Sequence, residues 1–410
     1  MTVAPAPPTR AFQYPTEGRV QPLSRTRRPF TTEDIERFQD ICSQQTRKED
    51  YPLASAVDNN AVIYDAAVLR KAILGGQVTR DAAMAELQYC LLQGPGVYAI
   101  KGCCDLAIVD RASEAFRVIL KREAAESGPR GDHFAPAGNN GRIWNSFQKH
   151  SEQDPENFVS YYANDLLALA SESWLGPGYQ VTAQTNIVNP GGRAQEPHRD
   201  YHLGFQDEDT AARFPIVSQI ASQLLTLQLA VAHTDMPLES GPTQLLPFSQ
   251  HFDYGFQAYR HKEFADVFHA NMVQLALDKG DALFFNPALF HAAGDNNTRD
   301  LYRSANLIQV SAAWGKCMES VDRESMLKQL WPYMTAYAKG ESAEQSNVDA
   351  LFAAVADGYS FPTNLDKDPP PPSGHCPPNQ LDIARSALSK NQDQATLSTL
   401  LDEYAQKRLP

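Results

Sequence analysis

The sequence has few cysteines, no apolar run long enough for a membrane helix and no excess of basic residues. Its six cysteines are spread over 410 residues without a Cys-x-x-Cys pair, so zinc-ribbon and thioredoxin-like motifs are excluded and reduced, packed thiols are expected. The longest uncharged stretch, 214–234, carries several Ser and Gln side chains and is too polar for a bilayer. We therefore expect no transmembrane helix.

The charge balance limits the classes of binding partner that the protein is expected to have. With 36 Lys and Arg against 49 Asp and Glu, the net charge is −13, which disfavours nucleic acid and anionic membrane surfaces. A small-molecule substrate is the better expectation, and the sequence leaves the oligomeric state undetermined. Residues 1–30 are rich in Pro and Arg and hold no apolar signal segment, so we predict a flexible N-terminal arm and a cytoplasmic protein.

The pattern of residues 31–177 is largely helical, with strands expected at the edge of a barrel. Thr31 is a predicted N-cap, and a helix following Thr79 is predicted to stop at Gly94 before a short strand at 97–102. Gly94-x-Gly96-x-x-Ala99 resembles a dinucleotide fingerprint, but that motif needs the strand before the glycines and the helix after them. The order here is reversed, so the glycines are interpreted as a helix stop and turn.

In residues 178–314 the hydrophobic pattern changes from helical spacing to a period of two residues. Polar and apolar residues alternate in 179–188 and 225–232, and further short strand patterns cover 272–277, 282–285 and 304–312. Many short strands joined by turns predict a mainly β fold with flanking helices, a double-stranded β-helix or jelly roll of the cupin-like kind. Residues 315–410 return to helical patterns around the Pro-rich connector at 369–372, and one final helix is predicted over 381–406.

The strongest chemical signal is His198-x-Asp200, followed by His291 far along the chain. On a strand, positions 198 and 200 point to the same face, and a third ligand from a distant strand can complete a triangle. Two His and one carboxylate leave open coordination positions for a bidentate 2-oxo acid and O2, as in non-haem Fe(II) oxygenases. Arg303 opens the next strand and could hold the remote carboxylate of the 2-oxo acid.

Together with the loop Glu239-Ser-Gly-Pro-Thr-Gln244 and its continuation to His251, these residues resemble the phytanoyl-CoA dioxygenase family of Fe(II)/2-oxoglutarate-dependent oxygenases over roughly 178–314. The resemblance implies that His198, Asp200 and His291 are catalytic iron ligands, that Arg303 binds 2-oxoglutarate, and that Gln195 is a further cosubstrate contact. It implies a dioxygenase that uses Fe(II), 2-oxoglutarate and O2. The expected reaction is hydroxylation of an organic small molecule with release of succinate and CO2.

The sequence departs from the family pattern in two places: the loop ends in Pro247-Phe-Ser-Gln-His251, and Ala293 replaces a frequent hydroxyl. Two rival functions stay open, a catalytically inactive cupin-like protein that binds a small molecule, and a zinc hydrolase. Halogenation is disfavoured because a chloride ligand needs a small residue at position 200. Desaturation, epoxidation and ring closure use the same oxidant and stay open with hydroxylation.

For other residues the sequence gives weaker evidence of a role in the site. His202 is expected beside the site without being a ligand, and the remaining strand-end histidines are expected to be hydrogen-bonded or surface residues. Trp144 and Phe134 are expected to pack in the core more readily than against a substrate. Some polar residues occupy alternating strand positions, and this pattern favours the site and solvent equally as the surface they face. These residues are Gln184, Asn186, Thr226 and Gln228.

Overall fold

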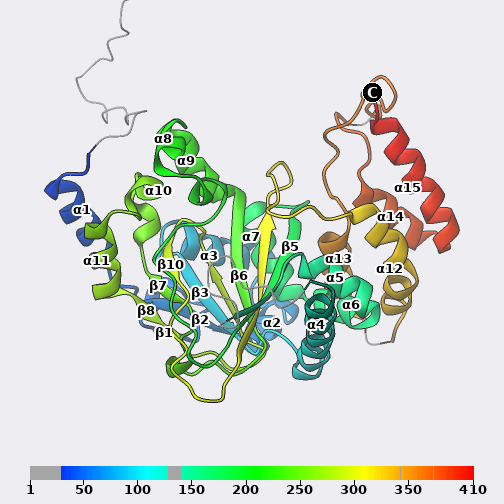
Figure 1. Cartoon of the computed structure of the whole chain (residues 1–410). Coiled ribbons are helices and arrows are strands. Elements are labelled where there is room, and N and C mark those ends of the chain that lie inside the picture. Colours follow the sequence, from blue (N-terminus) through cyan, green and yellow to red (C-terminus); the bar gives the residue numbers. More distant parts are fainter. Residues whose placement is uncertain (1–28, 128–139, 342, 373) are drawn as a thin grey trace, which may run out of the picture.

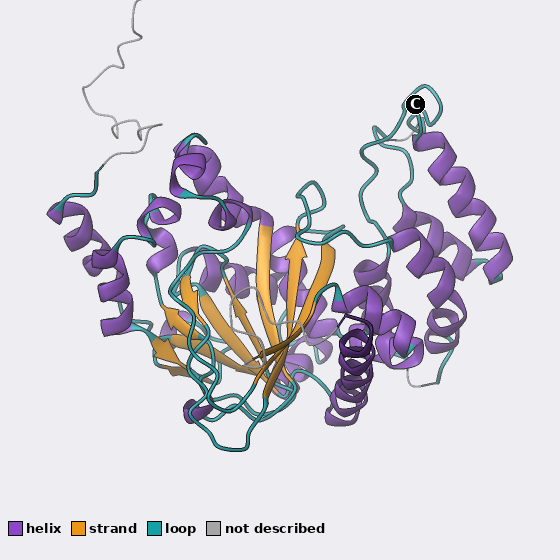
Figure 2. Ribbon diagram, in the orientation of Figure 1, coloured by secondary structure: helices purple, strands orange, loops and turns teal. Residues whose placement is uncertain are grey.

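The computed structural model describes residues 29–127, 140–341, 343–372 and 374–410, and its strands form two sheets (Figures 1 and 2). The predicted N-terminal arm, apart from its last two residues, and Phe134 lie outside these ranges. The larger sheet has the order β1 (Ala56–Asp58), β2 (Ala61–Asp65), β3 (Val97–Lys101), β9 (Ala282–Phe285), β6 (Thr226–Ala232), β11 (Arg303–Ser311), β5 (Gln180–Val188) and β4 (Asn140–Ile143). The smaller sheet has the order β10 (Phe290–Ala292), β7 (Gln244–Leu246) and β8 (Val273–Gln274).

Helices cover both sides of this pair of sheets. Those before β5 are α1 (Thr32–Cys42), α2 (Ala66–Leu74), α3 (Arg80–Leu92), α4 (Leu106–Ser127), α5 (Ser146–Gln153), α6 (Pro155–Tyr162) and α7 (Asp165–Leu175). Those after it are α8 (Glu208–Ala212), α9 (Ile216–Ser222), α10 (Gly255–Ala258), α11 (Lys262–Asn271), α12 (Arg323–Ala338), α13 (Gln345–Val355), α14 (Gln380–Ser389) and α15 (Gln394–Arg408). The predicted double-stranded β-helix with flanking helices is confirmed, although the helices contain more residues than the strands.

The alternation in β6 and β11 divides the larger sheet into two faces. Leu227, Leu229 and Val231 of β6 belong to the main hydrophobic core, which the sheet shares with the flanking helices. Gln228 and Ala230 point the other way and line a cavity between the sheets. Because β11 pairs antiparallel with both β5 and β6, its own alternation continues the same two faces across the sheet.

A second apolar cluster covers the smaller sheet. Phe38 of α1 and Phe264 of α11 pack against Phe290 of β10 and Phe252. The Phe38 ring centroid lies 5.0 Å from that of Phe290 and 5.1 Å from that of Phe264. Figure 1 shows α1 and α11 on this side of the molecule, while α12–α15 lie beyond the opposite edge. The smaller sheet is thus held between the cavity and an aromatic layer.

Several local predictions agree with the structure and one needs correction. Thr31 caps α1, α3 ends at Leu92, and β3 follows the glycines. The final helix predicted over 381–406 is two helices, α14 and α15, because the chain turns at Asn391, whose φ is 52°. No helix among the described residues is long and apolar enough to cross a membrane.

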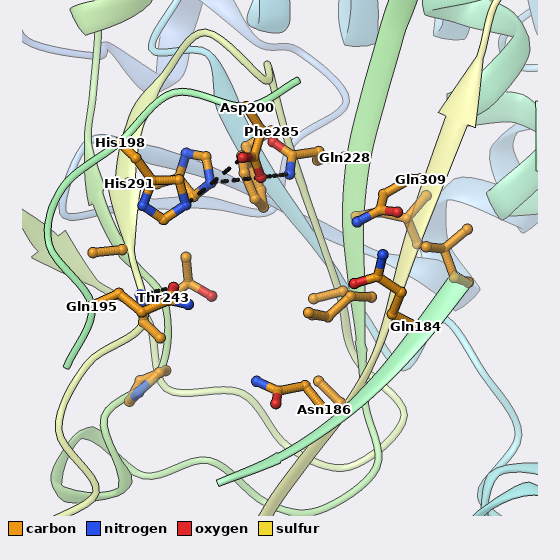
Figure 3. A pocket seen from close by; sticks show the side chains of 18 of the residues that line it. Gln184, Asn186, Gln195, His198, Asp200, Gln228, Thr243, Phe285, His291 and Gln309 are labelled. Carbon is orange, nitrogen blue, oxygen red and sulfur yellow. Dashed lines mark hydrogen bonds and ion pairs between the residues drawn. The ribbon is translucent and has the colours of Figure 1, made fainter. Parts of the chain in front are cut away.

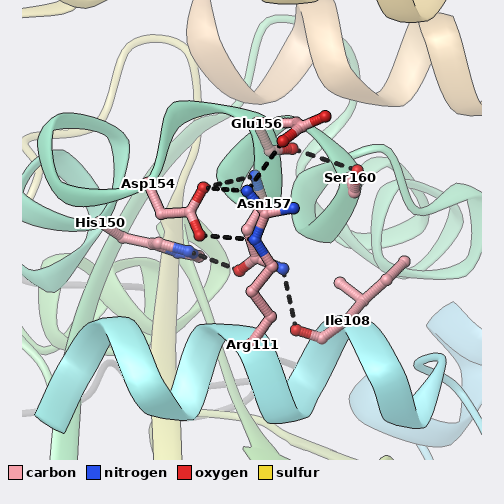
Figure 4. Close-up of polar contacts among 7 residues, drawn as sticks. All are labelled: Ile108, Arg111, His150, Asp154, Glu156, Asn157 and Ser160. Atoms are coloured by element: carbon pink, nitrogen blue, oxygen red, sulfur yellow. Dashed lines mark hydrogen bonds and ion pairs between the residues drawn. The ribbon is translucent and has the colours of Figure 1, made fainter.

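A polar junction, exposed at Arg111 and buried at His150 and Asn157, joins α4 to α5 and α6 (Figure 4). Arg111 of α4 pairs with Asp154 and Glu156, and the Asn157 amide donates to the Ile108 carbonyl at 3.0 Å. His150 Nε2 lies 2.9 Å from Asn157 Oδ1. These contacts anchor the helical layer that covers the larger sheet.

A second buried histidine, His233, follows β6 and links the sheet to this layer. It lies between the Ser113 hydroxyl at 2.8 Å and the Tyr161 hydroxyl at 2.9 Å. Burial lowers the pKa of His150 to about 4 and that of His233 to about 3. Both histidines are therefore neutral in the folded protein near pH 7.

These two histidines predict acid destabilisation. In the unfolded chain a histidine has a pKa near about 6.5, so between that pH and about 4 the unfolded state binds more protons and the free energy of unfolding falls as the pH falls. His233→Gln removes one of the groups, and its melting temperature should fall less steeply over this range than that of the wild type. Calorimetry across the range measures both slopes, and equal slopes would contradict the assignment.

Candidate metal centre

The site begins with an antiparallel bridge between His198 and His291. The His198 N–H donates to the His291 carbonyl at 2.9 Å, and the His291 N–H donates back at 3.1 Å. The Asp200 N–H donates to the Pro287 carbonyl at 3.0 Å. The segment that carries His198 and Asp200 is therefore an extended edge beside β10. It was predicted as part of a strand, but it forms one β-bridge at His198 together with isolated backbone hydrogen bonds, such as that from the Gln195 N–H to the Ala293 carbonyl at 2.9 Å.

Arg199, between these two residues, ties the segment to the smaller sheet's outer layer. Its guanidinium is buried and donates to the carbonyls of Ser249 at 2.6 Å and Phe252 at 3.0 Å. It also stacks over the rings of Phe256 and Phe290. Because Arg199 points outward from the barrel, the side chains on either side of it point inward.

The three predicted ligands meet inside the barrel (Figure 3). Their ligand atoms all lie within 4.8 Å of one another. His198 Nε2 is 3.9 Å from Asp200 Oδ1, and His291 Nε2 is 3.5 Å from Asp200 Oδ2. The structure thus brings together residues that are separated by about ninety positions in the chain.

The hydrogen bonds of the rings decide which nitrogens face the centre. Nδ1 of His198 lies 2.9 Å from the Glu196 carbonyl, and Nδ1 of His291 lies 2.8 Å from the Leu289 carbonyl. A carbonyl accepts, so each Nδ1 carries the proton and each Nε2 offers a lone pair. This is the tautomer that binds a metal through Nε2.

The charges also suit a divalent cation. Burial alone would raise the pKa of Asp200, but the contact with His291, the neighbouring His198 and the hydrogen bond from Gln228 lower it to about 2. Burial, reinforced by the neighbouring His291, lowers the pKa of His198. A carboxylate and neutral imidazoles are the forms that coordinate metals. The donor set of two nitrogens and one oxygen fits iron in the open facial arrangement.

Gln228 of β6 orients the carboxylate. Its Nε2 donates to Asp200 Oδ2 at 2.7 Å, and it lines the cavity. The sequence left four polar residues evenly divided between the site and solvent. The structure places Gln184, Asn186 and Gln228 at the cavity, whereas Thr226 is buried and does not line it. Strand alternation put Gln228 among the candidates, but only the folded sheet shows its contact with Asp200.

Arg303, at the start of β11, lines the same cavity and is 7% exposed. Its Nη1 donates to the carbonyls of Ser240 at 2.6 Å and Gly294 at 3.2 Å, and no carboxylate of the described residues forms an ion pair with it. Burial lowers its pKa to about 10, so the guanidinium is still charged at neutral pH. A buried cation without an anionic partner is suited to binding an anion.

The cavity between the ligands and Arg303 has a volume of about 500 Å³. Gln195 lies on its wall, where its Oε1 accepts from the Ala293 N–H at 3.3 Å, and Thr243 of the Gly-Pro loop lies nearby (Figure 3). Trp144, expected in the core, also lines the cavity. Thr243 was not singled out from the sequence as a site residue, although it belongs to the loop that did stand out.

Other candidates lie apart from the centre. His202 is outside the metal-binding group, as expected, and Arg299 is exposed in the loop before β11. The histidines expected to have structural partners have them: His251 contacts the Gly94 carbonyl and His261 contacts Glu208. The two arginines therefore differ in burial: Arg303 is buried at the cavity and Arg299 is exposed in a loop.

A family model described as phytanoyl-CoA dioxygenase (PhyH) matches residues 92–305, just over half of the chain. The chain belongs to the phytanoyl-CoA dioxygenase family. The resemblance stated from the motifs is confirmed, and membership agrees with the expected cofactors Fe(II), 2-oxoglutarate and O2. The matched region contains the three candidate ligands and Arg303. No curated protein matches the chain.

Similar solved structures include three proteins of low sequence identity. The alpha-ketoglutarate-dependent epimerase SnoN from nogalamycin biosynthesis is 19% identical, with 57% of this chain and 84% of SnoN covered and a TM-score of 0.40. The carbocyclase SnoK from the same biosynthesis is 17% identical, with 58% and 85% covered and a TM-score of 0.37. AviO1 from Streptomyces viridochromogenes Tue57 is 15% identical, with 58% and 99% covered and a TM-score of 0.41. SnoN has also been solved with Fe3+, alpha ketoglutarate and nogalamycin RO.

The geometry predicts which histidine binds the metal. His291→Ala should lose stoichiometric Fe(II) binding because it removes one of three ligands, whereas His202→Ala should retain it. Metal analysis of both purified variants after anaerobic loading measures the difference. Equal iron content in the two variants would contradict the assignment of His291.

Proposed function

We propose that this protein is a non-haem Fe(II)/2-oxoglutarate-dependent dioxygenase that hydroxylates an organic small molecule and releases succinate and CO2. The observation that carries the proposal is the placement of a two-histidine, one-carboxylate cluster and a buried, anion-free Arg303 on the wall of one cavity. A cytoplasmic location and a small-molecule substrate go with this proposal.

Each residue has a role that follows from its contacts. His198, Asp200 and His291 hold the iron, and Gln228 fixes the orientation of the Asp200 carboxylate. Arg303 binds the remote carboxylate of 2-oxoglutarate, and Gln195 is a second contact on the same wall. When bound, iron and 2-oxoglutarate supply the O2-dependent oxidation. The protein's part is to place the substrate carbon beside the metal and to keep competing water out.

The two rival functions explain fewer features of the site than the oxygenase does. An inactive binding protein has no use for three converged ligands together with a hydrogen bond that orients the carboxylate. A zinc hydrolase uses a similar ligand set, but it leaves the buried charge of Arg303 without an anion to bind. The carboxylate of Asp200 occupies the position that a chloride ligand would need, which supports hydroxylation over halogenation.

Metal-dependent turnover of 2-oxoglutarate tests the proposal. Protein loaded anaerobically with Fe(II) and then exposed to O2 should convert 2-oxoglutarate to succinate, and Zn(II)-loaded protein should not. Asp200→Ala should abolish succinate release while retaining the fold by circular dichroism, because the barrel core is untouched. Succinate release that is independent of iron, or full activity in Asp200→Ala, would reject the oxygenase.

A matched pair of arginines tests the cosubstrate site. Arg303→Leu should weaken 2-oxoglutarate binding by about 2 to 5 kcal/mol, because a desolvated charge pair is lost, whereas Arg299→Leu in the exposed loop should bind normally. Anaerobic calorimetric titration of 2-oxoglutarate into each Fe(II)-loaded variant measures this difference. The reverse result would assign the cosubstrate anchor to the loop.

A further inference from the structure

Four amide side chains line the cavity: one lies beside Asp200, and three lie on the wall across from the histidine ligands (Figure 3). They come from three adjacent strands: Gln184 and Asn186 of β5, Gln228 of β6 and Gln309 of β11. Gln309 is directly opposite Gln228 in the register of β11 and β6, and Asn186 is opposite Ala305 in that of β11 and β5. We call these four residues the amide wall.

Two members of the amide wall are engaged by the protein itself. Gln228 donates to Asp200, as described above. Gln184 accepts a hydrogen bond on Oε1 from Arg142 Nη1 at 2.8 Å. Each of these amides thus has one hydrogen bond within the protein, although Gln228 Oε1 has no donor among the described residues.

The other two, Gln309 and Asn186, have no such contact. Neither side chain forms a hydrogen bond with any residue in the described part of the chain, and the side-chain oxygen of each is buried without a donor. Gln309 is 8% exposed. A buried amide without a partner destabilises a folded protein, and an apolar residue would pack better at either position. A ligand bound in the cavity would supply the partners that both amides lack among the described residues.

The kind of ligand follows from the chemistry of the wall. An amide offers both a donor and an acceptor, and a hydroxyl group is the neutral group that can pair with either end. Arg142 on the same cavity disfavours an ammonium group, and Glu196 disfavours a carboxylate on the substrate. Leu307 and Phe285 add apolar surface beside these groups.

We infer that Gln309 and Asn186 bind the substrate, and that the substrate is an uncharged compound with an apolar body and hydroxyl groups on the side that faces them. This inference rests on the proposed oxygenase function. It assigns specificity to the strands of the barrel, where rigid positions hold a substrate more accurately than loops do.

The first test needs no ligand. In the ligand-free protein, Gln309→Met and Asn186→Leu should melt at the same temperature as the wild type or higher, because no hydrogen bond is lost. Gln219→Met is the matched control: Gln219 is 1% exposed, and its amide donates to the carbonyls of Ala211 at 3.1 Å and Phe214 at 3.0 Å. The control should melt lower. Equal losses in Gln309→Met and Gln219→Met would make Gln309 a structural residue and overturn the inference.

The second test uses p-nitrophenyl glucoside, galactoside and mannoside as uncharged hydroxylated probes with an apolar ring. Titrated anaerobically into protein loaded with Fe(II) and 2-oxoglutarate, at least one glycoside should bind, and its fully O-methylated derivative should bind roughly tenfold more weakly. Gln309→Met should weaken binding of the glycoside by a similar factor. In this variant the glycoside and its O-methylated derivative should bind equally well. Failure of all three glycosides, or equal binding of the methylated forms, would overturn the inference.

One spectroscopic control separates this inference from the proposed function. Fe(II) and 2-oxoglutarate bound together give a visible charge-transfer band in the absence of O2, and Gln309→Met should keep the wild-type band. If the wild type lacks the band, the proposed oxygenase itself fails. If the band is present and hydroxyl groups make no difference to binding, only the role of the amide wall fails.

Discussion

The single antiparallel bridge between His198 and His291 is the interaction on which the candidate site depends. It brings two segments that are far apart in the sequence into direct backbone pairing, with hydrogen bonds of 2.9 and 3.1 Å. Arg199 supports it from outside, because its buried guanidinium binds two carbonyls of the neighbouring loop. If this segment moved away from β10, the two imidazoles would separate and the candidate metal site would be lost.

Electrostatics explain how an acidic protein keeps a cavity suited to an anion. The net charge is −13, yet inside the barrel Arg303 is held by two backbone carbonyls and faces no described carboxylate partner. Backbone carbonyls stabilise the guanidinium without neutralising it. Asp200, by contrast, is kept ionised by the histidines beside it. One cavity thus holds a carboxylate suited to a metal at one point and a guanidinium suited to an anion at another.

The two faces of the larger sheet serve different purposes. The face with Leu227, Leu229 and Val231 belongs to the main core shared with the helices, and buried His233 joins that layer through Ser113 and Tyr161. The opposite face carries amide side chains in place of apolar ones. These amides bind Asp200, Arg142 or, by our inference, the substrate. Stability and specificity therefore belong to alternate residues of the same strands.

The sequence by itself determined the strand pattern, the iron-ligand candidates and the choice of Arg303 over Arg299, because each depends on local order: alternation, the His-x-Asp spacing, and a strand start against a run of turn formers. It could not place Gln228 on Asp200 or set Gln309 across from Gln228, since both contacts depend on how β6 and β11 pair in space. It also predicted one helix where Asn391 separates α14 from α15, because helical periodicity continues across a short turn. Tertiary structure decided which polar residues face the cavity, because alternation defines two faces of a strand but only packing decides which of them is buried against helices.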